Sequence, residues 1–360
     1  MTKMPPRPPL LQQGFRPFFL LAGIWAPVAL AIWIVAIVSG VAPPTALPFA
    51  AWHPHELLFG YAGAVVAGFL LTAVPNWTGR PPVSGTPLLG LCLLWLGARL
   101  FGLLGGTVSP WPAVALDAGF WLALVAAMGR EVAAGRNWRN LPVIALVSLL
   151  GIACLLSQLE AVGLETGPVS RRLGLAVILG LIGLIGGRVV PSFTRNWLAK
   201  RAPALLPAPF GLVDRAALAL LLLGVSSWAA RPAASATGVL LVLAGAGVLA
   251  RLGRWRGPAT LAEPLVTILH LGYAWLGAGL LLLGLGILAP DSFGRLAGLH
   301  ALTAGAIGTM TLATMTRATL GHTGRALTAD GLTVLLFGLV QTGALLRVLA
   351  PNDDNSLFIT

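Results

Sequence analysis

Eleven long apolar runs constrain the fold of this chain more than any other feature of its sequence. The runs lie near residues 20–39, 56–74, 87–104, 113–129, 141–158, 172–190, 212–229, 236–252, 263–288, 296–317 and 331–349. About 20 mostly apolar residues span the hydrocarbon core of a bilayer as a helix, so each run predicts one transmembrane helix. Only 9% of the residues are charged, whereas a soluble globular domain carries roughly 25%. We therefore predict an all-α polytopic membrane protein that forms a single transmembrane helical bundle over residues 1–360.

The distribution of basic residues predicts the orientation of these helices. Of the 23 Lys and Arg residues, 17 belong to the N-terminus and the even-numbered loops. The positive-inside rule places that side in the cytoplasm, which puts the N-terminus inside and the end of an eleven-helix chain outside. The longest loop, near residues 191–211, is interpreted as a cytoplasmic hinge between two halves. The net charge of +12 is spread over short loops and does not indicate nucleic-acid binding.

The two cysteines limit how a haem could be bound, and the small residues indicate how the helices pack. Cys92 and Cys154 both lie within apolar runs, without a CxxC or CxxCH motif, so any haem must be bound non-covalently. Small residues at four-residue intervals predict close helix packing, although they could also make room for a flat macrocycle. These positions are Gly60, Ala64 and Gly68 in one run, and Ala301, Gly305 and Thr309 in another.

Histidines at one end of the predicted bundle suggest a metal site. His53, His55 and Glu56 stand at the outer mouth of the second helix, and His300 lies about one turn inside the outer end of the tenth. Imidazole suits both copper and iron, so convergence of these side chains at one depth predicts a centre for copper or non-haem iron. The alternative is that single histidines at helix ends are packing or interfacial residues.

The cytoplasmic side carries the other two histidines and a set of arginines. His270 lies about two turns inside the ninth helix, and His322 follows the tenth. Because 22 residues separate His322 from His300, roughly 33 Å of helix lies between them and they cannot share one metal. The arginines at span ends are Arg80, Arg188, Arg195 and Arg317. They would suit haem propionates below an axial His270; the alternative partners are anionic lipid headgroups.

Some of the intramembrane charges have a simpler structural interpretation. Arg99 and Asp117 fall at almost the same depth across a short hairpin, which predicts an ion pair because lone charges in a membrane are costly. Arg188 and Arg317 are close enough to apolar helix that we expect each to have a buried partner.

The polar segments inside the apolar runs together resemble the NnrS family. They are Gly14–Phe19, His53–Glu56, Leu71–Arg80, Gly186–Asn196, His270–Trp275, and His300 with Gly321–Arg325. The resemblance runs in order over nearly the whole chain and includes all five histidines. It implies a membrane protein containing haem b and copper, located in the bacterial inner membrane and linked to nitric oxide metabolism, denitrification and protection from nitrosative stress. The family pattern has twelve helices, so we expect the last one to be missing here.

Two classes of function follow from the resemblance and the residues. In the first, His53, His55 and His300 hold a catalytic copper or iron that binds and reduces nitric oxide, with Glu56 as a further ligand or proton carrier, or one of these histidines holds a haem. A quinol or another donor would then supply electrons through a haem, with His270 and His322 as axial ligands and Tyr273 beside it. In the second, the protein transports or handles copper or nitrosylated metal, or binds haem without turnover.

Overall fold

The computed structural model describes residues 8–350, and all of its regular secondary structure there is helical. Eleven helices in this part of the chain are long and apolar enough to cross a membrane. The predicted polytopic all-α fold and its number of spans are therefore confirmed. The chain forms two compact units, Met1–Val177 and Ile178–Thr360. The single bundle domain over residues 1–360 stays a prediction.

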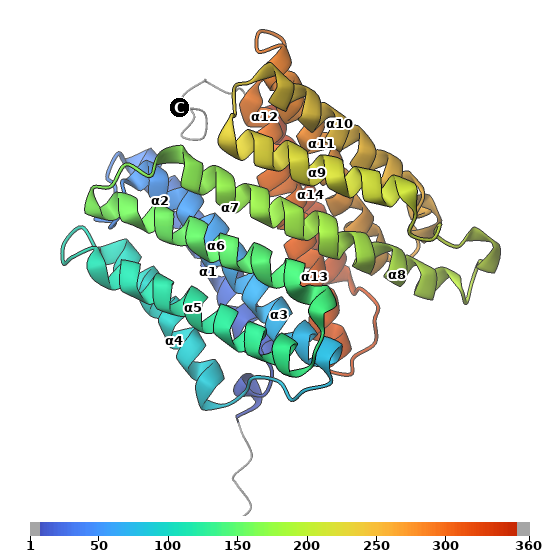
Figure 1. The fold of residues 1–360 in the computed structure, drawn as a ribbon, viewed down its shortest axis with the longest axis horizontal. Coiled ribbons are helices and arrows are strands. Elements are labelled where there is room, and N and C mark those ends of the chain that lie inside the picture. The colour runs from blue at the N-terminus through green and yellow to red at the C-terminus, as the bar shows by residue number, and fades with distance from the viewer. Residues whose placement is uncertain (1–7, 351–360) are drawn as a thin grey trace, which may run out of the picture. The chain divides into compact units, whose positions relative to one another are not determined.

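The first unit contains the first five spans and most of α7. Its helices are α1 (Phe15–Ser39), α2 (Phe49–His55), α3 (Gly63–Thr78), α4 (Thr86–Leu104), α5 (Trp111–Ala134), α6 (Leu141–Leu159) and α7 (Gly167–Leu181). Helix α4 packs on α5, α5 packs on α6, and α1 packs on α3 (Figure 1). Proline stands in the first turn of α4, α5 and α6, where its missing N–H costs no helical hydrogen bond.

The second unit is built around α11. Its helices are α8 (Gly187–Leu198), α9 (Leu212–Ala230), α10 (Ser235–Gly253), α11 (Pro264–Leu288), α12 (Arg295–His300), α13 (Gly308–His322) and α14 (Gly331–Leu349). Helix α10 packs against both α9 and α11 (Figure 1). Glycines allow this close approach, since a Cβ at Gly245 would lie 2.7 Å from the backbone oxygen of Gly277.

Three spans contain a π-helical segment: Glu56–Ala62, Ile182–Gly186 and Ala301–Ile307. Such segments are rare and occur frequently at functional sites. Two of them follow directly after a histidine, His55 in the first unit and His300 in the second.

Two predicted boundaries were wrong, both because hydropathy misses polar residues that pack inside. The second span begins at Phe49 rather than near residue 56, so His55 lies within the span and not at its mouth. The loop expected from residue 191 begins after α8 ends at Leu198. The division between the units also falls inside α7, after Val177, rather than in the loop predicted as a hinge.

Close packing at the small residues is confirmed. A Cβ at Gly68 would lie 2.8 Å from the ring of Phe19, and one at Gly305 would lie 2.6 Å from the ring of Trp275. In both places the missing side chain admits an aromatic ring of a neighbouring helix.

A candidate metal centre in the first unit

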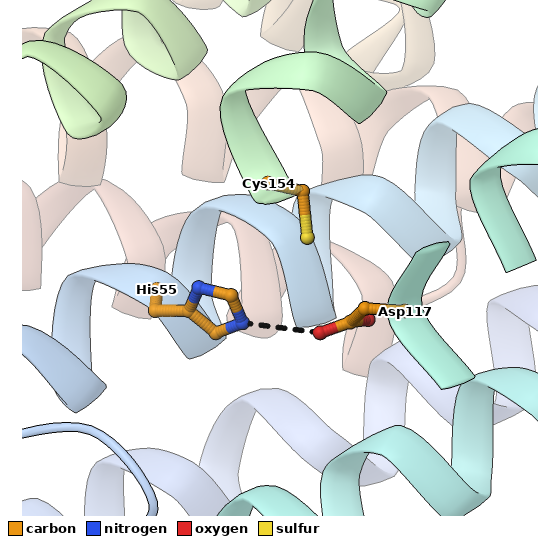
Figure 2. Close-up of side chains that lie close together, drawn as sticks. All are labelled: His55, Asp117 and Cys154. Carbon is orange, nitrogen blue, oxygen red and sulfur yellow. Dashed lines mark ion pairs between the residues drawn. The ribbon is translucent and has the colours of Figure 1, made fainter. Parts of the chain in front are cut away.

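Three buried side chains of the first unit form a set of potential metal ligands. His55 comes from α2, Asp117 from α5 and Cys154 from α6, and one ligand atom of each lies within 4.8 Å of the others. Figure 2 shows the Cys154 sulfur pointing towards the space between the His55 ring and the Asp117 carboxylate. His55 Nε2 is 3.4 Å from Asp117 Oδ2. The set combines a thiol, an imidazole and a carboxyl group.

The hydrogen bonds around His55 favour one tautomer of its ring. Gln158 Nε2 lies 2.6 Å from Asp117 Oδ2 and 3.1 Å from His55 Nε2. The carboxylate accepts only, so the amide nitrogen must face it and donate both of its hydrogens. His55 Nε2 is then an acceptor, and Nδ1–H donates to Ser157 Oγ at 3.0 Å. A neutral imidazole held through its other ring N–H is the arrangement that metal-binding histidines use.

An arginine and a second carboxyl group extend this cluster. Arg99 Nη1 donates to Glu56 Oε2 at 2.8 Å, and Arg99 Nη2 pairs with Asp117 Oδ1. The predicted ion pair of Arg99 with Asp117 is therefore confirmed. Trp25 Nε1 also donates to Glu56 Oε2, at 2.9 Å, whereas Glu56 Oε1 has no hydrogen-bond partner among the described residues. One guanidinium thus serves two buried carboxyl groups, which favours a further cation nearby.

The backbone of the π-helical segment makes room for these charges. A Cβ at Gly60 would lie 2.8 Å from Glu56 Oε2 and 2.9 Å from Arg99 Nη1. Trp95 Nε1 donates to the Gly60 carbonyl oxygen at 3.1 Å. Glycine at this position therefore lets the span approach the buried ion pair closely.

The structure does not bring His53 beside His55. The two residues are both in α2, and positions i and i+2 of a helix do not face each other. The His53 ring stacks on Trp33 with centroids 4.4 Å apart, while His55 contacts residues of α6. The expected convergence of these two histidines was wrong because the segment is helical.

The remaining predicted histidines belong to the second unit. His270 is buried on α11, and its Nε2 lies 2.8 Å from Thr194 Oγ1. His300 ends α12, and His322 ends α13 with an exposed side chain. The convergence of His300 with the first-unit residues stays a prediction.

The arginines predicted to bind a cofactor have diverse partners. Arg80 pairs with Glu131, and Arg195 donates to the carbonyl oxygen of Pro207 at 2.8 Å. The Arg317 guanidinium lies 3.9 Å from the ring centroid of Phe193.

Arg188 and Tyr273 differ in burial. The buried partner expected for Arg188 was wrong, because this side chain is exposed. Tyr273 is buried, and its hydroxyl accepts from Arg251 and donates to the carbonyl oxygen of Gly183.

Sequence reasoning missed the α6 side of the candidate centre. Cys154, Ser157 and Gln158 are spaced three and four residues apart, which places them on one helix face. A polar pair one turn after a cysteine in an otherwise apolar helix was the signal that could have found them. From the sequence, Cys154 served only to exclude a CxxC or CxxCH motif and covalently bound haem.

The fold and this buried cluster define a polytopic membrane protein with a candidate metal centre inside its first unit. The family model described as NnrS protein matches residues 9–359. The chain therefore belongs to the NnrS family and is a membrane protein linked to nitric oxide. No curated protein and no solved structure matches it.

Proposed function

We propose that the protein binds nitric oxide at a copper ion in the first unit and reduces it with electrons from a quinol or another donor, protecting the cell from nitrosative stress. The observation that carries the proposal is the buried triad of His55, Asp117 and Cys154 around one small volume. Thiolate and imidazole together are a soft donor set that suits copper. Copper bound there would supply a one-electron redox centre to which nitric oxide can coordinate.

The protein's own residues have defined roles in this proposal. Ser157 holds the Nδ1–H of His55 and keeps Nε2 available as a ligand atom. Arg99 offsets the charge of Asp117 and Glu56 within the span. The burial of all three candidate ligands excludes bulk water, while an uncharged diatomic gas can enter from the lipid.

A haem on His270 fits the structure less well. Thr194 donates its hydroxyl hydrogen to Val190 O, so His270 Nε2–H donates to Thr194. His270 Nδ1 faces Gly257, where even a Cβ would lie only 2.8 Å away. Nε2 is thus engaged by Thr194, while Nδ1 has no hydrogen-bond partner among the described residues, and we derive no step through haem. A b-type haem on His270, with His322 as a second axial ligand, stays a prediction that the optical spectra of wild type and His270→Ala test.

The main experiment compares the two buried cysteines. Cys92 on α4 is buried like Cys154 but has no place in the triad. We expect Cys154→Ser and His55→Ala to lose copper in metal analysis and to lose anaerobic nitric oxide consumption at an electrode. Cys92→Ser should retain both. Loss of a direct ligand should exceed the about 10- to 100-fold loss that changes in an outer partner cause.

Two results would contradict this proposal in different ways. Equal copper content in both cysteine variants would remove the triad as the metal site. Copper-loaded, reduced protein that leaves nitric oxide untouched would favour transport or storage of copper or of nitrosylated metal, or binding without turnover. Retained consumption in His300→Ala would in addition exclude His300 as a ligand of the same metal.

We also propose the bacterial inner membrane as the location, with the N-terminus in the cytoplasm. The excess of basic residues in alternate loops supports this orientation. Fusions in the loops containing Arg139 and Arg201 should give no alkaline phosphatase activity, and a fusion after Pro43 should be active. The opposite pattern would exchange the two sides.

A further inference from the structure

Gln158 occupies the position between two of the candidate metal ligands. Its Nε2 hydrogen-bonds both His55 Nε2 and Asp117 Oδ2, at 3.1 and 2.6 Å. These are the same two atoms that a bound cation would need. Its Oε1 is buried and has no hydrogen-bond partner among the described residues. The NH₂ group of Gln158, which carries partial positive charge, therefore lies where a bound metal ion would lie.

This arrangement makes the amide and a metal ion mutually exclusive. The lone pair of His55 Nε2 can accept the Gln158 hydrogen or bind a metal, but it cannot do both. A metal ion must therefore break the hydrogen bond to His55 Nε2 before it gains that ligand, whereas Asp117 Oδ2 has a further lone pair and can bind the ion while it still accepts from Gln158. The bond to the carboxylate is of the stronger, charge-assisted kind, and it holds the amide against His55 Nε2.

We propose that Gln158 is an internal competitor that raises the threshold for metal binding at the triad. This inference rests on the proposed metal site and explains how that site would select soft cations over others. A cation that gains only the imidazole and the carboxylate must give up part of that gain to displace the amide. A soft cation also gains the Cys154 sulfur, because the hydrogen bonds of the Gln158 amide go to His55 and Asp117, and so overcomes the competitor.

The test measures cuprous ion affinity by competition with a chromogenic chelator in purified, full-length protein. Gln158→Leu keeps a similar volume but cannot donate, so it should bind cuprous ion at least about tenfold more tightly. Ser157→Ala should change affinity in the opposite direction, because it removes the support of His55 Nδ1. A merely structural role for Gln158 would lower affinity in both variants.

Two further variants keep the test decisive. Gln158→Asn retains a buried amide but is one methylene shorter and cannot reach both ligands, so it should bind more tightly than wild type even if the leucine variant folds poorly. Gln341→Leu is the matched control, because Gln341 also bridges two partners, Trp275 and Thr309, but in the second unit. Its affinity should equal that of wild type.

Failure of the inference and failure of the proposed function give different results. If wild type binds cuprous ion through Cys154 but Gln158→Leu and Gln158→Asn bind no more tightly, the competitor role is overturned and the metal site stands. If wild type and Cys154→Ser bind cuprous ion equally, the site itself is overturned. Cobalt(II) serves as a second probe, since its thiolate charge-transfer band reports whether Cys154 is a ligand.

Discussion

The two units each bury an arginine completely, but they use it differently. Arg251 of the second unit donates to Asp214, to the hydroxyl of Tyr273, and to the carbonyl oxygens of Gly183 and Gly187. None of its nitrogens lacks a partner among the described residues. It therefore pairs with one carboxylate and holds the π-helical segment in place.

Arg99 of the first unit pairs with a larger number of negative groups. It faces two carboxyl groups, Glu56 and Asp117, and the cluster retains buried polar atoms without partners among the described residues. These atoms are Glu56 Oε1, Arg99 Nε and Gln158 Oε1. A satisfied cluster stabilises a fold, whereas an incompletely satisfied one with excess negative charge can accept a ligand. This difference supports the proposal that a cation binds in the first unit.

The largest expected effect comes from removing each arginine. Breaking a buried ion pair by removing one partner costs about 3–5 kcal/mol, so Arg99→Met and Arg251→Met should both unfold at markedly lower temperature in detergent. Added cuprous ion should restore part of the stability of Arg99→Met, because a cation can offset its unpaired carboxylates. It should not help Arg251→Met.

The control for this comparison is Arg254. It also contacts Asp214, at 3.6 Å, but its side chain is 33% exposed. Exposed ion pairs contribute about 0–1 kcal/mol, so Arg254→Met should change the unfolding temperature little. Equal rescue of both buried-arginine variants by cuprous ion would remove the distinction between the two clusters.

A smaller effect is expected at the backbone on which Arg251 packs. A Cβ at Gly187 would lie 2.3 Å from Arg251 Nη1 and 2.5 Å from its Cζ, so Gly187→Ala must displace the guanidinium. Overpacking of this kind costs about 1–3 kcal/mol. Gly102→Ala in the first unit would approach Glu56 Oε1 only to 3.4 Å and should be nearly neutral. Thermal unfolding of both variants measures the difference, and equal losses would show that the second cluster is no more tightly packed than the first.

The sequence predicted the spans well because apolar runs of membrane length have few alternative structures. It also predicted the Arg99 and Asp117 pair, since equal depth across a short hairpin brings their side chains together. It could not predict the partners of His55, because those depend on how α2, α5 and α6 rotate about their axes. The spacing of His53 and His55 was misleading for the same reason, since a helix directs them apart. Hydropathy alone does not reveal that a span continues through a polar residue such as Glu56, whose side chain is hydrogen-bonded inside the protein.

The smallest expected effect concerns the helix cap formed by Asp330, whose contribution to stability depends on pH. Asp330 precedes α14, and its Oδ1 accepts from Thr333 N at 2.8 Å. Hydrogen bonding with Thr333, first with its side chain and then with its backbone N–H, lowers the pKa of the Asp330 carboxyl below its usual range. A lowered folded-state pKa contributes stability that is complete above the unfolded pKa of about 3.9 and is lost as the pH falls through the lower folded value.

Asp330→Ala should therefore unfold at slightly lower temperature than wild type at pH 7, and the difference should shrink as the pH falls below about 4. Asp330→Asn is the matched control, because an amide oxygen also caps a helix but does not titrate in this range. The helix cap in Asp330→Asn should persist at low pH.

In contrast, Asp214 accepts from Gly211 N at the start of α9 and pairs with Arg251. Asp214→Asn should lower the unfolding temperature at pH 7 by more than either change at Asp330, because a buried ion pair and a cap depend on it together. An equal loss at the two aspartates would mean that the buried pair of the second unit stabilises the fold no more than an exposed cap does.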